Sequence, residues 1–139
     1  MYRRILIAHD GSEGAAKALA AGIALAKTLH SELHMVSVEE LPRLPETIGE
    51  VVEERRIEGR RFEKVIHQAQ ARAKLEGIKL RAHVIAGHAV PSIVDFIERD
   101  DFDLLVIGCV GHWEIYNRLI GSTTDRLVEL APCPVLVVK

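Results

Sequence analysis

Short apolar segments alternate with longer amphipathic segments along the whole chain. The apolar segments predict buried strands, because a strand covered on both faces carries apolar residues at consecutive positions. The amphipathic segments repeat with the helical period and predict helices. Strands are predicted at residues 4–8, 32–38, 79–85, 104–107 and 135–138, and helices at about 12–30, 50–76, from 91 onward, and 122–130.

This alternation of strand and helix predicts an α/β fold, in which helices sandwich a five-stranded parallel sheet. The chain has 139 residues, so we expect a single domain, residues 1–139, with a core of its own. In open sheets of this kind, ligands bind beyond the carboxyl ends of the strands, where the strand order reverses. Polar residues that follow the strands are therefore the first candidates for a site.

The most informative segment follows the strand predicted at 104–107. Gly108 and Gly111 come first, and after nine further residues Gly121 and Ser122 begin a helical pattern. Glycines let the backbone fold tightly around a ligand and offer it N–H groups. A helix N-terminus adds unpaired N–H groups and the positive end of the helix dipole. The spacing predicts a nucleotide phosphate held between the two glycine segments.

A second polar segment follows the first predicted strand, where His9, Asp10 and Gly11 precede Ser12. Ser12 is a good N-cap for the next helix. The carboxylate of Asp10 suits ribose hydroxyls or Mg²⁺ better than bare phosphate, and the simpler alternative is a loop cap. If this strand neighbours the one before Gly108, a single ligand can contact both segments.

Charge and composition narrow the function classes. The formal net charge is −2, and Arg55, Arg56, Arg60 and Arg61 alternate with glutamates, so nucleic acid is not expected as the main partner. The two cysteines stand far apart, which indicates neither a disulfide framework nor a zinc site. No signal peptide and no apolar run of about 18 residues is found, so we expect no membrane contact and a cytoplasmic location.

Three segments together resemble the universal stress protein family, and the similarity covers essentially the whole chain. They are Ala8-His9-Asp10-Gly11-Ser12, the glycine spacing from Gly108 to Ser122, and the ending Ala131-Pro132-Cys133-Pro134-Val135-Leu136-Val137-Val138. The resemblance implies an adenine nucleotide alpha hydrolase-like sheet in the order 3-2-1-4-5. It also implies a homodimer that pairs through the C-terminal strand, Val135 to Val138. The ligand that it implies is ATP or AMP, with or without Mg²⁺.

The resemblance also implies roles for single residues. Asp10 corresponds to the acid that reaches the ribose or metal side of the nucleotide, and Val38 to the apolar wall under the adenine. Thr123 would add a hydroxyl to the cradle of phosphate and ribose. That cradle corresponds to Gly108, Gly111, Gly121 and Ser122.

The chain departs from the family pattern in two places. His9 stands where an aliphatic residue or Thr is usual, and residues 112–116 (HWEIY) stand where small and basic residues are common. Glu114 adds negative charge near the expected phosphates, which disfavours a triphosphate unless a metal or His112 offsets it. Trp113 and Tyr116 either cap the glycine loop or face a partner.

Several catalytic readings fit less well than binding. Nucleotidyltransferases of related architecture carry HxGH after the first strand, and the second His is missing here; response regulators cluster acids where this chain has Asp10 alone. No residue is placed as a general base beside water, and no arginine finger is identifiable. We therefore predict an adenine-nucleotide-binding stress-response regulatory protein that signals by occupancy. The alternatives are a slow Mg-dependent ATPase or phosphotransferase, and a dimeric adaptor with an empty site.

Two further sets of residues carry weaker signals. Cys109 lies in the glycine loop, where it is either redox-active or a small packing residue. The remaining histidines, among them His34, His67 and His83, show no ligand spacing and are interpreted as surface or satisfied groups.

Overall fold

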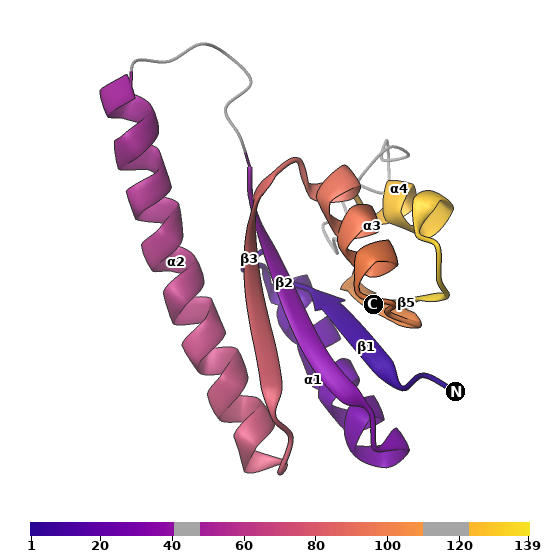
Figure 1. Ribbon diagram of the computed structural model, residues 1–139. Coiled ribbons are helices and arrows are strands. Elements are labelled where there is room, and N and C mark those ends of the chain that lie inside the picture. The colour runs from indigo at the N-terminus through magenta and orange to yellow at the C-terminus, as the bar shows by residue number, and fades with distance from the viewer. Residues whose placement is uncertain (41–47, 110–122) are drawn as a thin grey trace.

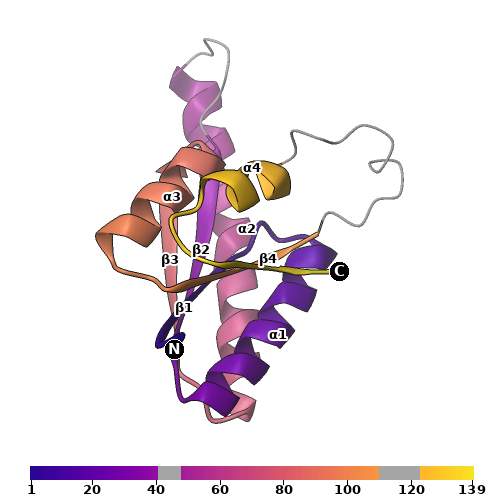
Figure 2. The same ribbon diagram turned by 90° about the vertical axis from the view of Figure 1, so that its right-hand side faces the viewer.

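A parallel sheet forms the middle layer of the molecule, and helices cover both of its faces (Figures 1 and 2). The computed structural model describes residues 1–40, 48–109 and 123–139. The elements in chain order are β1 (Arg4–Ala8), α1 (Glu13–Leu29), β2 (Glu32–Glu40), α2 (Ile48–Leu75), β3 (Leu80–Gly87), α3 (Ala89–Arg99), β4 (Leu104–Gly108), α4 (Thr123–Leu130) and β5 (Val135–Val138).

The five strands are ordered β3-β2-β1-β4-β5, and each pairs in parallel with its neighbour. The chain runs outward from β1 to β2 and β3, and then crosses to the other side of β1 for β4 and β5. The predicted fold class and strand order are confirmed. The reversal places the carboxyl ends of β1 and β4 side by side, the position at which such sheets bind ligands.

Two apolar cores lie on opposite faces of the sheet. Ile5 and Ile7 of β1 belong to the core shared with α1 and α2, whereas Leu6 of the same strand belongs to the core under α3 and α4. All three are fully buried. Because successive strand residues point to opposite faces, β1 has to be apolar at each of these positions, which is the pattern read in the sequence.

Local signals set the ends of α1. The Ser12 hydroxyl accepts a hydrogen bond from the Ala15 amide at 3.2 Å, as expected of an N-cap. At the other end His30 adopts a left-handed conformation, with φ of 56°, and its N–H reaches the Ala26 carbonyl. Among the described residues, no helix combines the length and apolar character that a membrane span requires.

Several element boundaries differ by one or two residues from the sequence-based prediction, and two of them have a clear reason. Helix α3 begins at Ala89, before Pro91, because a proline in the first helical turn costs no hydrogen bond. Strand β2 continues to Glu40, where it pairs with Gly87 at the end of β3. The longer pairing was not visible in the sequence, since acidic residues at the end of β2 resemble the start of a loop.

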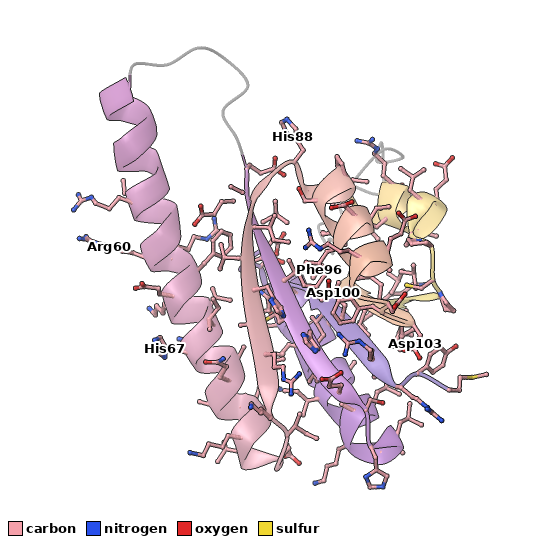
Figure 3. All side chains as sticks on the ribbon, in the orientation of Figure 1. Arg60, His67, His88, Phe96, Asp100 and Asp103 are labelled. Atoms are coloured by element: carbon pink, nitrogen blue, oxygen red, sulfur yellow. The ribbon has the colours of Figure 1, made fainter. Side chains whose placement is uncertain are left out.

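The histidine interpretation was wrong for His34, which is only 4% exposed. Its Nδ1 lies 2.8 Å from Nε2 of His83, and among the described residues its own Nε2 has no hydrogen-bond partner. The two rings are nearly parallel, and each makes a T-shaped contact with a phenylalanine ring, His34 with Phe102 and His83 with Phe96. Figure 3 labels Phe96 on the side of α3 that faces the sheet. Burial is the main cause that lowers the pKa of both imidazoles, which favours the neutral pair.

Candidate functional site

A pocket opens at the carboxyl edge of the sheet, where the strand order reverses. It lies above the ends of β1, β2 and β4, and the beginnings of α1, α3 and α4 complete its walls. In Figure 2 these helix ends gather at one end of the strands. The lining residues are Ala8, His9, Asp10, Ser12, Ala15, Val36, Val38, Ala89, Ile93, Ile107, Gly108, Cys109, Thr123, Thr124 and Leu127.

The loop from β1 to α1 supplies the carboxylate of the pocket. Asp10 is exposed, and its Oδ1 accepts a hydrogen bond from the Ser12 amide at 2.9 Å. The carbonyl of Asp10 accepts another from the guanidinium of Arg61, which reaches over from α2. Gly11 follows with φ of +87°, a conformation that favours glycine. The loop is therefore ordered by its own side chains and by a neighbouring helix.

His9 is buried between this loop and the sheet, with 7% of its surface exposed. Its backbone N–H donates to the Val36 carbonyl at 2.9 Å, and its carbonyl accepts from the Ser37 hydroxyl at 2.7 Å. The imidazole Nδ1 accepts from the Gly11 amide at 3.0 Å. Burial lowers the pKa of His9, and the nearby Asp10 carboxylate partly opposes this. The neutral ring fits the acceptor role that its Nδ1 performs.

Two glycines let β4 meet α1 without intervening side chains. A Cβ added to Gly108 would lie 2.3 Å from the Gly14 carbonyl oxygen, and one added to Gly14 would lie 2.7 Å from the Cys109 carbonyl oxygen. Side chains do not fit at either position. The first glycine of the predicted cradle is thus required for the close approach of β4 and α1, whatever it contributes to a ligand.

Apolar residues form the opposite wall of the pocket. Val36 and Val38 belong to β2, Ile107 to β4, and Ala89 and Ile93 to the first turns of α3. Such a wall suits the flat face of an aromatic base, because burial of apolar surface is favourable and no polar group is left unpaired.

The start of α4 faces the same pocket. Thr123 and Thr124 line it, and the Thr124 hydroxyl donates to the Gly108 carbonyl at 3.1 Å. This bond ties α4 to the end of β4. The helix N-terminus therefore presents hydroxyl groups and its positive dipole end to the pocket.

The structure brings Asp10, Val38, Gly108 and Thr123 together around this one pocket, although they come from separate parts of the sequence. Gly111, Gly121 and Ser122 lie outside the described residues, as do His112, Trp113, Glu114 and Tyr116. The roles in ligand binding given to all of these residues stay predictions.

Sequence reasoning missed the contribution of α3 and of Thr124. Ala89 and Ile93 carry no chemical signature, and only the crossing of α3 over the sheet brings them to the pocket. Thr124 directly follows the predicted Thr123, and the expectation that both helix-start hydroxyls face a ligand could have found it. Arg61 was interpreted as part of a solvated helix face, and its bond to Asp10 needed the packing of α2 to be visible.

The described lining is weakly charged. Asp10 places one negative charge in the pocket, and neither lysine nor arginine is among the described residues that line it. The described residues also contain no group of three or more His, Cys, Asp or Glu side chains that could hold a metal ion.

The family model and the individual relatives found by sequence comparison agree on one family. The model of the universal stress protein family matches residues 1–139. The universal stress protein MJ0531 of Methanocaldococcus jannaschii is 31% identical over 147 residues, which cover 100% of this chain and 83% of that protein. The universal stress protein YxiE of Bacillus subtilis is 28% identical over 151 residues and is matched over 100% of both chains.

Solved structures show the same fold. The universal stress protein UspA from Lactobacillus plantarum superposes with a TM-score of 0.88 at 24% identity, covering 99% of this chain and 98% of that one. A universal stress protein in complex with cAMP gives a TM-score of 0.79 at 23% identity and covers 99% and 97%. An Arabidopsis thaliana family protein with AMP bound gives 0.69 at 14% identity and covers 98% and 90%.

Proposed function

We propose a function from the premise that this chain belongs to the universal stress protein family. The protein binds an adenine nucleotide in the pocket at the carboxyl edge of the sheet, and nucleotide occupancy carries a regulatory signal in a stress response. The observation that carries this proposal is the convergence of Asp10, Val38, Gly108 and Thr123 on one pocket at the strand reversal. Family proteins of the same fold with cAMP and with AMP bound support the choice of an adenine nucleotide.

The lining fits such a ligand in three parts. Val36, Val38 and Ile107 offer an apolar surface to the base. The Asp10 carboxylate is exposed and, beyond its bond to the Ser12 amide, can accept hydrogen bonds from ribose hydroxyls. The starts of α1 and α4 present dipole ends that favour phosphate. With ATP, Mg²⁺ would be held mainly by phosphate oxygens, together with Asp10.

Isothermal calorimetry with AMP, ADP and ATP, each with and without Mg²⁺, tests the proposal. Asp10→Asn keeps an oxygen for the Ser12 amide but removes the charge, and it should weaken binding by about tenfold, because a charged acceptor is lost. Asp95→Asn is the matched control, since Asp95 is an exposed residue of α3 whose partner is Arg99. Absence of binding by any adenine nucleotide to the wild-type protein would refute the function.

Signalling by occupancy is to be separated from turnover. We propose that the nucleotide is retained rather than consumed, so chromatography after prolonged incubation with ATP and Mg²⁺ should recover ATP intact. Phosphate release faster than nucleotide exchange in a single-turnover experiment would instead establish the slow ATPase or phosphotransferase. Mass spectrometry of the co-purifying small molecule would identify the nucleotide directly.

We also propose that the protein is a cytoplasmic homodimer paired through β5. This strand stands at the edge of the sheet beyond β4, and Leu136 in its middle is 37% exposed. An apolar edge strand is an aggregation hazard unless it is covered. Val137→Pro should yield monomers in multi-angle light scattering, and an unchanged dimer would refute this interface.

A further inference from the structure

The peptide unit between Asp10 and Gly11 is held at both ends. Its N–H, which belongs to Gly11, donates to Nδ1 of His9 at 3.0 Å. Its carbonyl, which belongs to Asp10, accepts from the guanidinium of Arg61 on α2. One group comes from the end of β1 and the other from a helix 51 residues further along the chain. The two bonds together fix the plane of a single peptide.

This peptide is one that could otherwise rotate. Gly11 has φ of +87° and no side chain, so its backbone has several accessible conformations of similar energy. Rotation about the Cα–C bond of Asp10 or the N–Cα bond of Gly11 would move the Ser12 amide, which holds the Asp10 carboxylate through its hydrogen bond to Oδ1. Arg61 also occupies the space beside Gly11, since its Nη2 would lie 2.8 Å from a Cβ added there. A side chain at position 11 would therefore displace the end of Arg61, and the positive φ favours glycine independently.

The His9 side chain accepts a backbone hydrogen bond in the same way that Asn and Asp side chains often do. An Asn or Asp side chain often accepts a hydrogen bond from the amide two residues later, and Asp10 does so with the Ser12 amide at 2.9 Å. The Nδ1 of His9 accepts from the amide of Gly11, also two residues later. His9 itself is anchored to β2 through its backbone bonds to Val36 and Ser37. The imidazole is thus a rigid acceptor attached to the sheet.

We propose that His9 is a positioning residue for the nucleotide site. By accepting a hydrogen bond from the Gly11 amide, it fixes the peptide that orients the Asp10 carboxylate toward the ligand. Arg61 fixes the other end of the same peptide and links the loop to α2. This inference rests on the proposed function, because the ligand that Asp10 meets is the adenine nucleotide. It assigns a purpose to a histidine that family resemblance leaves unexplained.

Substitutions at position 9 separate positioning from packing. His9→Leu keeps an apolar side chain of similar size but has no acceptor, and it should weaken AMP binding by about five- to tenfold, as expected for one lost hydrogen bond. His9→Asn places an oxygen near the position of Nδ1 and should restore affinity to within about twofold of wild type. His67→Leu is the matched control, because His67 is an exposed residue on the outer side of α2 (Figure 3).

Failure of rescue by His9→Asn, or wild-type affinity in His9→Leu, would overturn the proposal. Thermal denaturation of each variant accompanies the titrations. A loss of affinity in His9→Leu that Asn restores, at matched melting temperatures, supports positioning. If the weaker affinity instead follows the melting temperature across the variants, the role of His9 is packing and the proposal fails.

A readout without nucleotide distinguishes failure of this inference from failure of the proposed function. Nitrogen NMR of the ligand-free protein should show His9 as the neutral tautomer with hydrogen on Nε2, since Nδ1 is the acceptor. The Gly11 amide should exchange with solvent at least about tenfold faster in His9→Leu than in wild type or His9→Asn. The opposite tautomer, or an unchanged exchange rate, refutes the positioning role of His9 even if nucleotide binds. If the expected tautomer and exchange rates are found in a protein that binds no nucleotide, the hydrogen bond from Gly11 to His9 is supported and only the proposed function is refuted.

Discussion

Replacing Gly108 by alanine tests the contact on which the pocket is built. The new Cβ would lie 2.3 Å from the Gly14 carbonyl oxygen and 2.4 Å from the Gly14 carbonyl carbon, and ordinary contact begins at 3.4 Å. The end of β4 and the start of α1 would therefore have to separate by about 1.1 Å. Both neighbours are backbone atoms, so rotation of a side chain cannot relieve the overlap.

The expected cost is at the upper end of the overpacking range, about 3 kcal/mol or more. For a chain of this size, that corresponds to a fall in melting temperature of roughly 10 °C. Urea denaturation followed by circular dichroism measures the free energy of unfolding, and calorimetric scans measure the melting temperature. Nucleotide affinity should fall as well, because Thr124 is hydrogen-bonded to the Gly108 carbonyl.

Two other glycines calibrate the result. At Gly22, a Cβ would lie 2.6 Å from Cδ1 of Ile7, a side-chain atom that can move, so Gly22→Ala should cost less than Gly108→Ala. At Gly49, near the start of α2, a Cβ would meet no atom of the described residues within 4 Å, and Gly49→Ala should leave stability within about 0.5 kcal/mol of wild type or raise it slightly. A Gly108→Ala protein as stable as Gly49→Ala would refute the described contact between β4 and α1.

Three further predictions concern the core, the acid response and a thiol. Leu105→Ala should cost about 2–5 kcal/mol in urea denaturation, because Leu105 is fully buried, whereas Val128→Ala, at 51% exposure, should cost little. The free energy of unfolding should be highest above pH 6.5 and decrease below it, because burial lowers the pKa of His34 and His83 in the folded state. The unfolded imidazoles take up protons near pH 6.5, so acid favours the unfolded chain. A urea midpoint that is independent of pH between 7 and about 5 would contradict this prediction. The Cys133 thiol should react with iodoacetamide more slowly in the folded than in the urea-unfolded protein, because burial raises its pKa, and equal rates by mass spectrometry would count against it.

The sequence predicted the fold because the apolar pattern was unambiguous. Ile5, Leu6 and Ile7 could only be a strand buried on both faces, and Ser12 and Gly77 marked helix ends with known chemistry. The strand order came from the family resemblance rather than from the pattern, since apolar strands pair equally well in several orders.

The site was only partly predictable. Asp10 and Gly108 follow strands directly, so topology alone brings them to the same edge of the sheet. The contact of Arg61 with Asp10 depends on how α2 lies across the strands, which helical periodicity does not determine. The pairing of His34 with His83 depends on the register of β2 and β3, in which His83 stands opposite Val36. Consecutive apolar residues leave that register unmarked.

The contact between Gly14 and Gly108 also limits how the proposed nucleotide signal could pass through the protein. Backbone atoms are in direct contact here, so we expect a bound nucleotide of the proposed kind to shift other walls of the pocket rather than this one. Helix α3 is the wall where we expect such a shift, because it packs on the sheet through the side chains of Val90, Ile93 and Phe96. A fluorescent reporter of binding therefore belongs on the outer side of α3, at exposed Glu98, and not on α1.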